Sequence, residues 1–131
     1  YSLSEDFVIV EYNGILLSVS SHEDPIQFGP NWLASWELLK VFHLPQGRVA
    51  FMDYSSKYMT LHDDQTIRFT EDRIGKKTSF KLIPLKNDEF AILAANNRYI
   101  SSENGFKDIT ANRVKIGEWE TFTLFKLLPP P

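Results

Sequence analysis

Near the C-terminus the chain reads Ile116-Gly117-Glu118-Trp119-Glu120-Thr121-Phe122, and this segment decides the fold because the chain contains it in three versions. The two earlier versions occupy residues 33–39 and 74–80. All three end in a large apolar residue that opens a strand-like run. The two positions before the last pair hold Trp-Glu in the first and third versions and Lys-Thr in the second. The shared positions predict the fold, and the positions that differ predict the function.

The similarity extends outward from these segments over almost the whole chain. The copies begin at Phe7, Val49 and Phe90, which gives a period of about 41 residues. The aligned apolar positions include Leu17, Met59 and Ile100, and then Leu39, Phe80 and Phe122. We therefore expect a single domain over residues 1–131. Its repeats cover about residues 7–48, 49–89 and 90–128, and residues 129–131 are a linker remnant.

Within each repeat, short apolar runs alternate with turn signals. In the first repeat Phe7 to Tyr12 is strand-like, and Asn13-Gly14 favours a hairpin turn. Trp36 to Leu44 is expected to form the fourth strand. No segment of useful length has the apolar spacing of a capped amphipathic helix. Three copies of four strands are too few for most propellers, which use about 4–8 blades, and predict an all-β fold, a twelve-strand β-trefoil with three pseudo-symmetric repeats.

The composition narrows the classes of function. The net charge of −3 and the absence of a basic block argue against nucleic acid as a partner. No apolar run is long enough to span a membrane, so no membrane partner is expected. The chain has no cysteine, which excludes disulfides, thiol catalysis and thiolate metal sites. Tyr1 at the first position suggests a mature chain or an excised domain.

Three segments carry a resemblance to a known family: Lys57-Tyr58-Met59-Thr60, residues 98–105 and residues 109–122. They resemble the fascin-like β-trefoil family, which includes actin-bundling proteins, and are closest in pattern to trefoil carbohydrate-binding modules of bacterial glycanases. The resemblance implies that a Trp and a Glu in each repeat grip a glucan, and that a neighbouring catalytic domain is a partner. The second repeat departs from this pattern at Lys77-Thr78, so its site is expected to be weak or lost.

The Trp-Glu pairs have suitable chemistry for a sugar. An indole stacks on the apolar C–H face of a pyranose, and a carboxylate accepts hydrogen bonds from the hydroxyl rim. We therefore predict ligand-binding roles for Trp36, Glu37, Trp119 and Glu120. Adjacent residues of a regular strand point to opposite faces, so both can meet one sugar only where the strand begins and twists. The alternative is structural: each Trp packs on the barrel, and each Glu is a solvated neighbour.

Trp32 is a further candidate, because it aligns with Arg73 and Lys115, which are long cationic residues. The alignment predicts an exposed position, and an exposed Trp calls for an explanation. Two interpretations stay open: Trp32 extends the first-repeat binding site, or it packs against a neighbouring domain.

The hairpin tips at residues 22–24 and 62–64 combine histidine with acidic residues, which is a donor set that some metals prefer. Aspartate, asparagine and glycine are also what tight turns require for backbone reasons, so we interpret the tips as turns. We expect no metal site and no cofactor. Paired carboxylates are numerous, but glycoside hydrolysis needs two that face each other across a cleft, and a small threefold trefoil offers shallow surface sites instead. No phosphate-binding glycine loop occurs, so an enzyme is not expected.

Two functions remain. The first is a non-catalytic carbohydrate-binding module or lectin-like domain that binds a glucan-type polysaccharide or another glycan through multivalent surface sites. The second is a fascin-like protein-interaction trefoil that binds actin or packs against other domains. The acidic charge favours the first, because actin side-binding proteins bring basic patches. The first implies an extracellular or secreted protein, and the second a cytoplasmic one.

Overall fold

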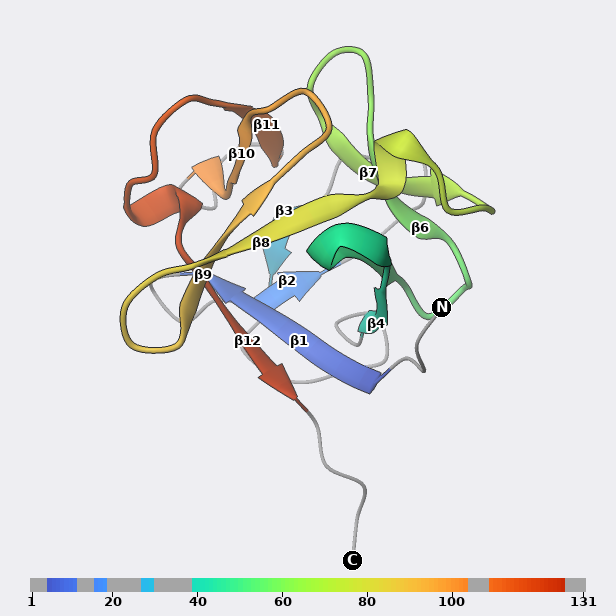
Figure 1. The fold of residues 1–131 in the computed structure, drawn as a ribbon, viewed down its shortest axis with the longest axis horizontal. Helices are drawn as coiled ribbons and strands as arrows, with labels where there is room; N and C mark the ends of the chain where they lie inside the picture. Colours follow the sequence, from blue (N-terminus) through green and yellow to red (C-terminus); the bar gives the residue numbers. More distant parts are fainter. Residues whose placement is uncertain (1–4, 12–15, 19–26, 30–38, 104–108, 127–131) are drawn as a thin grey trace, which may run out of the picture.

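A computed structural model describes residues 5–11, 16–18, 27–29, 39–103 and 109–126 (Figure 1). These residues form twelve strands and three short 3-10 turns. The strands are β1 (Glu5–Glu11), β2 (Leu16–Ser18), β3 (Gln27–Gly29), β4 (Leu39–His43), β5 (Arg48–Met52), β6 (Tyr58–Leu61), β7 (Ile67–Glu71), β8 (Phe80–Pro84), β9 (Glu89–Leu93), β10 (Tyr99–Ser101), β11 (Thr110–Arg113) and β12 (Phe122–Lys126). The turns are η2 (Pro45–Gly47), η3 (Lys76–Thr78) and η5 (Glu118–Glu120).

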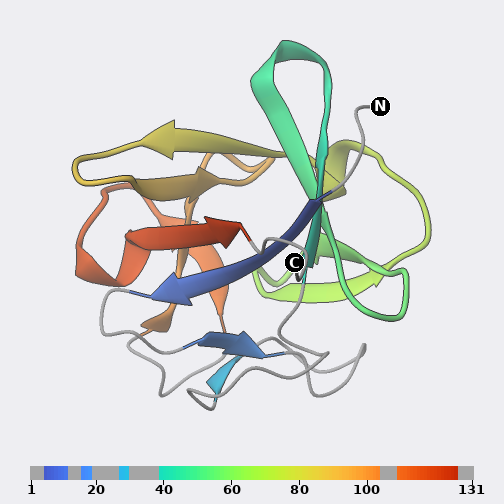
Figure 2. The same ribbon diagram turned by 90° about the horizontal axis from the view of Figure 1, so that it is seen from below.

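Six of the strands close into a barrel. Each pairs antiparallel with the next in the order β1, β4, β5, β8, β9 and β12, and β12 pairs with β1 to complete the circle. Figures 1 and 2 show β1 and β12 side by side, although they come from opposite ends of the chain. The remaining strands form three hairpins, β2–β3, β6–β7 and β10–β11. A six-strand barrel with three hairpins is a β-trefoil, so the predicted fold class is confirmed.

Strand pairing reproduces the threefold register that the sequence predicts. The last residue of each repeated segment faces the first residue of a repeat: Leu39 pairs with Phe7, Phe80 with Val49 and Phe122 with Phe90. The hairpins repeat in the same way, because Leu17 pairs with Phe28, Met59 with Phe69 and Ile100 with Ala111. A register shift after Tyr58 recurs after Tyr99. The three repeats are therefore equivalent at the level of single residue pairs.

The shared apolar positions form one core. Leu39, Phe80 and Phe122 are buried, as are Met59 and Ile100. All five belong to a single cluster that also contains residues of all three repeats. The side chain of Leu17, which is predicted to be their equivalent, lies outside the described part of the chain. Burying the apolar face of each repeat against the other two supplies the main favourable term in the stability of such a fold.

The connections use backbone conformations that suit tight turns. Gln46 and Gly47 in η2 have φ of 64° and 72°, and Asn87 and Asp88 in the β8–β9 connection have φ of 58° and 62°. Glycine, asparagine and aspartate enter this left-handed region more readily than other residues. Among the described residues, no helix has the length and apolar character needed to cross a bilayer.

Candidate functional site

The third copy of the repeated segment forms a 3-10 turn, not the start of a strand. The turn η5 holds Trp119 at its centre, and β12 begins only at Phe122. The Glu120 N–H donates to the Gly117 carbonyl at 3.2 Å, and the Thr121 N–H donates to the Glu118 carbonyl at 3.2 Å. A third bond ties the turn to the β10–β11 hairpin, because the Ser102 N–H donates to the Trp119 carbonyl at 2.8 Å. The backbone of Trp119 is therefore held in place from two sides.

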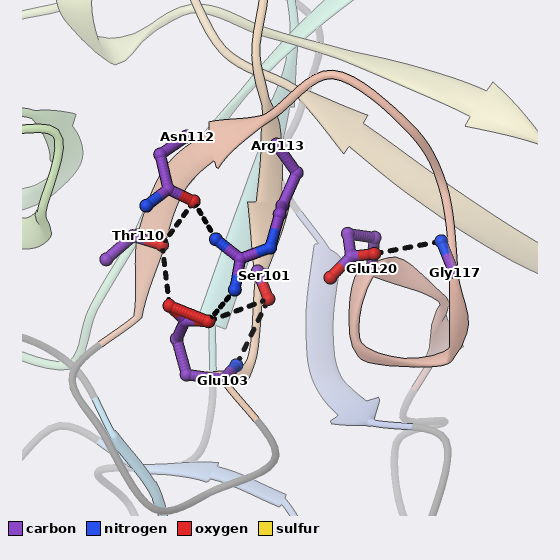
Figure 3. Close-up of polar contacts among 7 residues, drawn as sticks. All are labelled: Ser101, Glu103, Thr110, Asn112, Arg113, Gly117 and Glu120. Carbon is purple, nitrogen blue, oxygen red and sulfur yellow. Dashed lines mark hydrogen bonds and ion pairs between the residues drawn. The ribbon is translucent and has the colours of Figure 1, made fainter.

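Trp119 and Glu120 point to different environments. Trp119 is 39% exposed, whereas Glu120 is only 6% exposed. The Gly117 N–H donates to Glu120 Oε1 at 2.8 Å, so the carboxylate caps its own turn (Figure 3). A Cβ atom at position 117 would lie 3.1 Å from the same oxygen, which explains why glycine suits this position. Glu120 is therefore not the solvated neighbour that the structural alternative expects, and the ligand-binding roles of Trp119 and Glu120 stay predictions.

The second repeat builds the same turn with different residues. In η3 the Gly75 N–H donates to Thr78 Oγ1 at 2.7 Å, and Thr78 is buried. Thr78 therefore has the capping role that Glu120 has in η5. The two turns differ at their exposed central residue, which is Lys77 in the second repeat and Trp119 in the third. Lys77 Nζ donates to Asp63 Oδ1 at 2.8 Å at the tip of the β6–β7 hairpin.

A polar cluster, defined as Ser101, Glu103, Thr110, Asn112 and Arg113, lies on the β10–β11 hairpin next to η5 (Figure 3). The Arg113 guanidinium donates to Glu103 Oε1 and to Asn112 Oδ1. Thr110 Oγ1 donates to Glu103 Oε2 at 3.3 Å and to Asn112 Oδ1 at 3.0 Å. The Glu103 side chain is only 10% exposed. This network fixes charged groups on the hairpin that hydrogen-bonds to the Trp119 turn.

Sequence reasoning missed this cluster. Neither Glu103 nor Arg113 is among the ligand-binding residues that the sequence predicts. The contact between Glu103 and Arg113 depends on the strand register of the hairpin, in which Tyr99 faces Arg113. The local signal that was present is the alternation of polar residues at Thr110 and Asn112, which places both on one face of β11.

The remaining predicted site residues, Trp36, Glu37 and Trp32, lie outside the described residues, and their roles stay predictions. The first hairpin tip, residues 22–24, also lies outside them. At the second tip Asp64 Oδ1 accepts the Thr66 N–H at 3.0 Å, and Asp64 Oδ2 accepts a bond from Arg68 at 3.0 Å. These bonds are those expected of a turn aspartate. In the part of the chain that the structure describes, no three histidine or acidic side chains gather as a metal site would require.

Exposed apolar side chains surround the Trp119 turn. Val114 is 63% exposed and Ile116 is 37% exposed, and both lie on the connection that leads from β11 into η5. The aligned residues of the second repeat are Asp72 and Ile74. The segment from β11 to η5 in the third repeat therefore exposes three large apolar side chains, those of Val114, Ile116 and Trp119.

Comparison with known proteins gives no sequence relative but many structural ones. No protein family model and no curated protein sequence matches the chain. The designed 3-fold symmetric protein ThreeFoil superimposes with a TM-score of 0.80 at 15% identity, over 93% of this chain and 99% of that one. SeviL bound to asialo-GM1 saccharide gives a TM-score of 0.80 at 14% identity, over 97% of this chain and 100% of that one. At this identity the likeness establishes the fold alone.

Larger proteins contain the same fold as one part. The GlcNAcα1-4Gal releasing endo-β-galactosidase from Clostridium perfringens superimposes with a TM-score of 0.82 at 11% identity. The match covers 95% of this chain and 33% of that chain. The β-trefoil part of the predicted resemblance is thus confirmed, whereas membership of the fascin-like family stays a prediction.

Proposed function

We propose that this chain is a non-catalytic, lectin-like carbohydrate-binding domain whose third-repeat site is built around Trp119. The observation that carries the proposal is the exposed indole on a turn whose backbone is bonded both to its own cap and to Ser102, directly after β10. An indole has only two side-chain torsions, so on a backbone that is fixed before binding it loses little conformational freedom when a ligand stacks on it. The apolar C–H face of a pyranose ring is a suitable partner for such a surface.

The polar cluster supplies the other half of the chemistry. Arg113 lies on the hairpin that hydrogen-bonds to the Trp119 turn, its side chain is 33% exposed, and its guanidinium can donate to the hydroxyl rim of a sugar stacked on the indole. Glu103 is 10% exposed and both its oxygens accept hydrogen bonds within the cluster, so it holds Arg113 in place. Glu118 is exposed on the same turn and offers a carboxylate. In this arrangement Glu120 acts as a positioning residue, because its Oε1 atom is engaged by the Gly117 N–H.

The proposal extends to the first repeat by the threefold register. Trp36 and Glu37 align with Trp119 and Glu120, and we propose that they form a second site of the same kind, which Trp32 extends. Two weak sites on one domain bind a polymer with repeated sugar units more tightly than either site alone, so a glucan-type polysaccharide is the proposed ligand. Such a ligand places the protein outside the cell.

Two structural neighbours support this choice of ligand class. SeviL is bound to a saccharide, and the Clostridium perfringens neighbour is an enzyme that acts on a glycan and is about three times as long as its matched part. The second case supports the proposal that this domain works beside a catalytic domain. The support is by analogy, because many functions occur on the trefoil fold.

A second candidate function is a protein-interaction trefoil, and the exposed surface of Val114, Ile116 and Trp119 is the observation that favours it. Exposed apolar side chains on one short segment can contact a protein as well as a sugar. An actin filament or a neighbouring domain would be the partner in this case.

One experiment separates the two functions. Affinity gel electrophoresis against a panel of immobilised polysaccharides is run beside actin co-sedimentation, with the wild type, Trp119→Ala and Lys77→Ala. The proposal expects retardation by at least one neutral polysaccharide, a clear loss of that retardation in Trp119→Ala and no change of it in Lys77→Ala. Sedimentation with actin that depends on Trp119, without retardation by any glycan, would overturn it in favour of the second function.

A further inference from the structure

A pocket of about 350 Å³ lies where the second repeat meets the third. The β6–β7 hairpin contributes Leu61, His62 and Gln65 to its walls, and η3 contributes Lys76 and Lys77. The far wall is the turn between β9 and β10, with Ala95 and Asn96. Its volume lies at the lower end of the range for small-molecule sites, which is about 300–1,000 Å³, and suits a single pyranose ring.

A second hollow of about 240 Å³ lies next to the first. It is lined by Arg48, Lys76, Ser79 and Ala95, so Lys76 and Ala95 border both spaces. The charged residues that line the smaller hollow are Arg48 and Lys76, and no acidic residue among those that the structure describes lines it.

These cations lack carboxylate partners. Among the described residues, neither Arg48 nor Lys76 forms an ion pair. Arg48 faces Lys81 directly across the β5–β8 pair, and like charges at directly opposed positions of a sheet destabilise it. An anion placed near Arg48 and Lys76 relieves this repulsion.

The other charged groups of the pocket are already neutralised. Asp63 is paired with Lys77 at 2.8 Å, and this hydrogen bond and charge hold the pKa of Asp63 below its usual range. The pKa of His62 is lowered, first by burial and then by the charge of Arg68, so its imidazole is neutral at pH 7. Its Nε2 atom is hydrogen-bonded with Thr70 Oγ1 at 2.9 Å. The unpaired charge around the two spaces is therefore positive.

The walls of the pocket are held in place before any ligand binds. Asn96 Nδ2 donates to the Ala111 carbonyl at 2.8 Å, and Asn96 Oδ1 accepts the Arg98 N–H at 3.1 Å. Leu61 and Ala95 supply apolar surface for a ring. The side-chain amide of Gln65 forms no hydrogen bond with another described residue, so it can meet ring hydroxyls.

We propose that this pocket binds a pyranose that carries a carboxylate, with the ring against Leu61 and Ala95 and the carboxylate held by Lys76 and Arg48. This proposal rests on the proposed function, from which it takes carbohydrate as the ligand class. It adds that the sugar bound here carries a negative charge. The second and third repeats then select different sugars, because Lys76 and Lys77 stand where the third repeat has Glu118 and Trp119. The second repeat thus has a site for acidic sugars where the third repeat has a stacking surface for neutral ones.

The test is a titration of the ¹⁵N-labelled domain by NMR with four ligands: methyl glucuronide, methyl glycoside of N-acetylneuraminic acid, methyl glucoside and inorganic phosphate. The proposal expects at least one carboxylated sugar to shift the amide signals of Gln65, Lys76 and Ala95, and expects weaker binding at higher salt. Methyl glucoside and phosphate should bind about tenfold more weakly or not at all, since each lacks either the charge or the ring.

Variants assign the effect to the pocket. Lys76→Gln and Arg48→Gln should each weaken the carboxylated sugar about tenfold, the scale of one charge-assisted hydrogen bond. Lys115→Gln is the matched control, because Lys115 is an exposed lysine before η5, and it should change nothing. Unchanged affinity in Lys76→Gln, equal binding of glucoside and glucuronide, or phosphate binding as tightly as the sugar would each overturn the proposal.

The two proposals fail separately. Trp119→Ala should leave the carboxylated sugar bound at the pocket, because Trp119 is not among the pocket residues. Loss of polysaccharide retardation with retained glucuronide binding would count against the Trp119 site alone. Polysaccharide retardation that depends on Trp119, without any shift at Lys76, would count against the acidic-sugar pocket alone.

Discussion

Glu120 and Thr78 occupy equivalent positions in two repeats, and each accepts the backbone N–H of the glycine three residues before it, at 2.8 and 2.7 Å. A carboxylate and a hydroxyl thus perform one structural task. Glu120 and Thr78 therefore do not make the two repeats functionally different. The difference lies at the exposed position before them, which is Trp119 in the third repeat and Lys77 in the second.

The first prediction follows from this equivalence. Glu120→Thr should keep both the stability of the domain and its retardation by polysaccharide, because threonine already caps the turn in the second repeat. Glu120→Ala should lower the free energy of unfolding by about 1–2 kcal/mol, the usual cost of a lost cap. Chemical denaturation measures the first quantity and affinity electrophoresis the second. If Glu120→Thr folds normally but loses sugar binding, Glu120 contacts the sugar directly, as the sequence alone predicts.

The second prediction tests the core against the surface. Phe122 is buried in the shared core, so Phe122→Ala should lower the free energy of unfolding by about 3–5 kcal/mol. Trp119 is exposed on its turn, so Trp119→Ala should cost less than about 1 kcal/mol. Urea titrations followed by circular dichroism compare the two variants. Similar losses in both would show that the indole packs as part of the fold.

The third prediction concerns the number of working sites. Trp36→Ala and Trp119→Ala should each weaken one site by about 1–3 kcal/mol, the scale of a lost stacking surface and its hydrogen bonds. The double variant should lose far more polysaccharide binding than either single one, because the two sites act together on one polymer. Binding to immobilised polysaccharide measures the effect, and Lys77→Ala is the control. A double variant no weaker than Trp119→Ala would restrict binding to the third repeat.

The fourth prediction uses His62, whose pKa is lowered from its ordinary 6.5, first by burial. The folded state therefore binds this proton less readily than the unfolded chain does. Below the unfolded pKa the unfolded chain gains the proton first, so the free energy of unfolding should fall as the pH drops toward the folded pKa. Unfolding curves between pH 7 and pH 5 should show a steeper loss for the wild type than for His62→Gln. Equal slopes would mean that His62 titrates as an exposed histidine does.

Much of the fold was predictable because it depends on spacing. Leu39, Phe80 and Phe122 recur at one period, and a buried strand position tolerates only large apolar residues, so the pattern survives in the sequence. The opposite orientations of Trp119 and Glu120 were not predictable from that pattern. A strand start and a 3-10 turn begin with similar residues, and they are distinguished by the backbone hydrogen bonds of the turn and by the bond from Gly117 to the Glu120 carboxylate.

The functional groups depend on contacts between distant residues, which leave a weaker signal. The pairing of Glu103 with Arg113 requires the hairpin register, and the pocket of Lys76 and Ala95 requires two repeats to meet. The sequence shows that the second repeat has Lys77 at the position where the third repeat has Trp119. That the second repeat has a different site, and not merely a lost one, can be inferred only from the pocket, whose far wall comes from the third repeat.

The pairing of β1 with β12 has a consequence for synthesis. Of the described strands, β1 is synthesised first and β12 last, so the barrel can close only after β12 has been made, and this pair is the most distant in sequence. Until then β1 and β9 each lack the neighbour that β12 supplies, and their open backbone edges can pair with other chains. A nascent chain that ends before Phe122 therefore exposes two strand edges that the complete barrel covers.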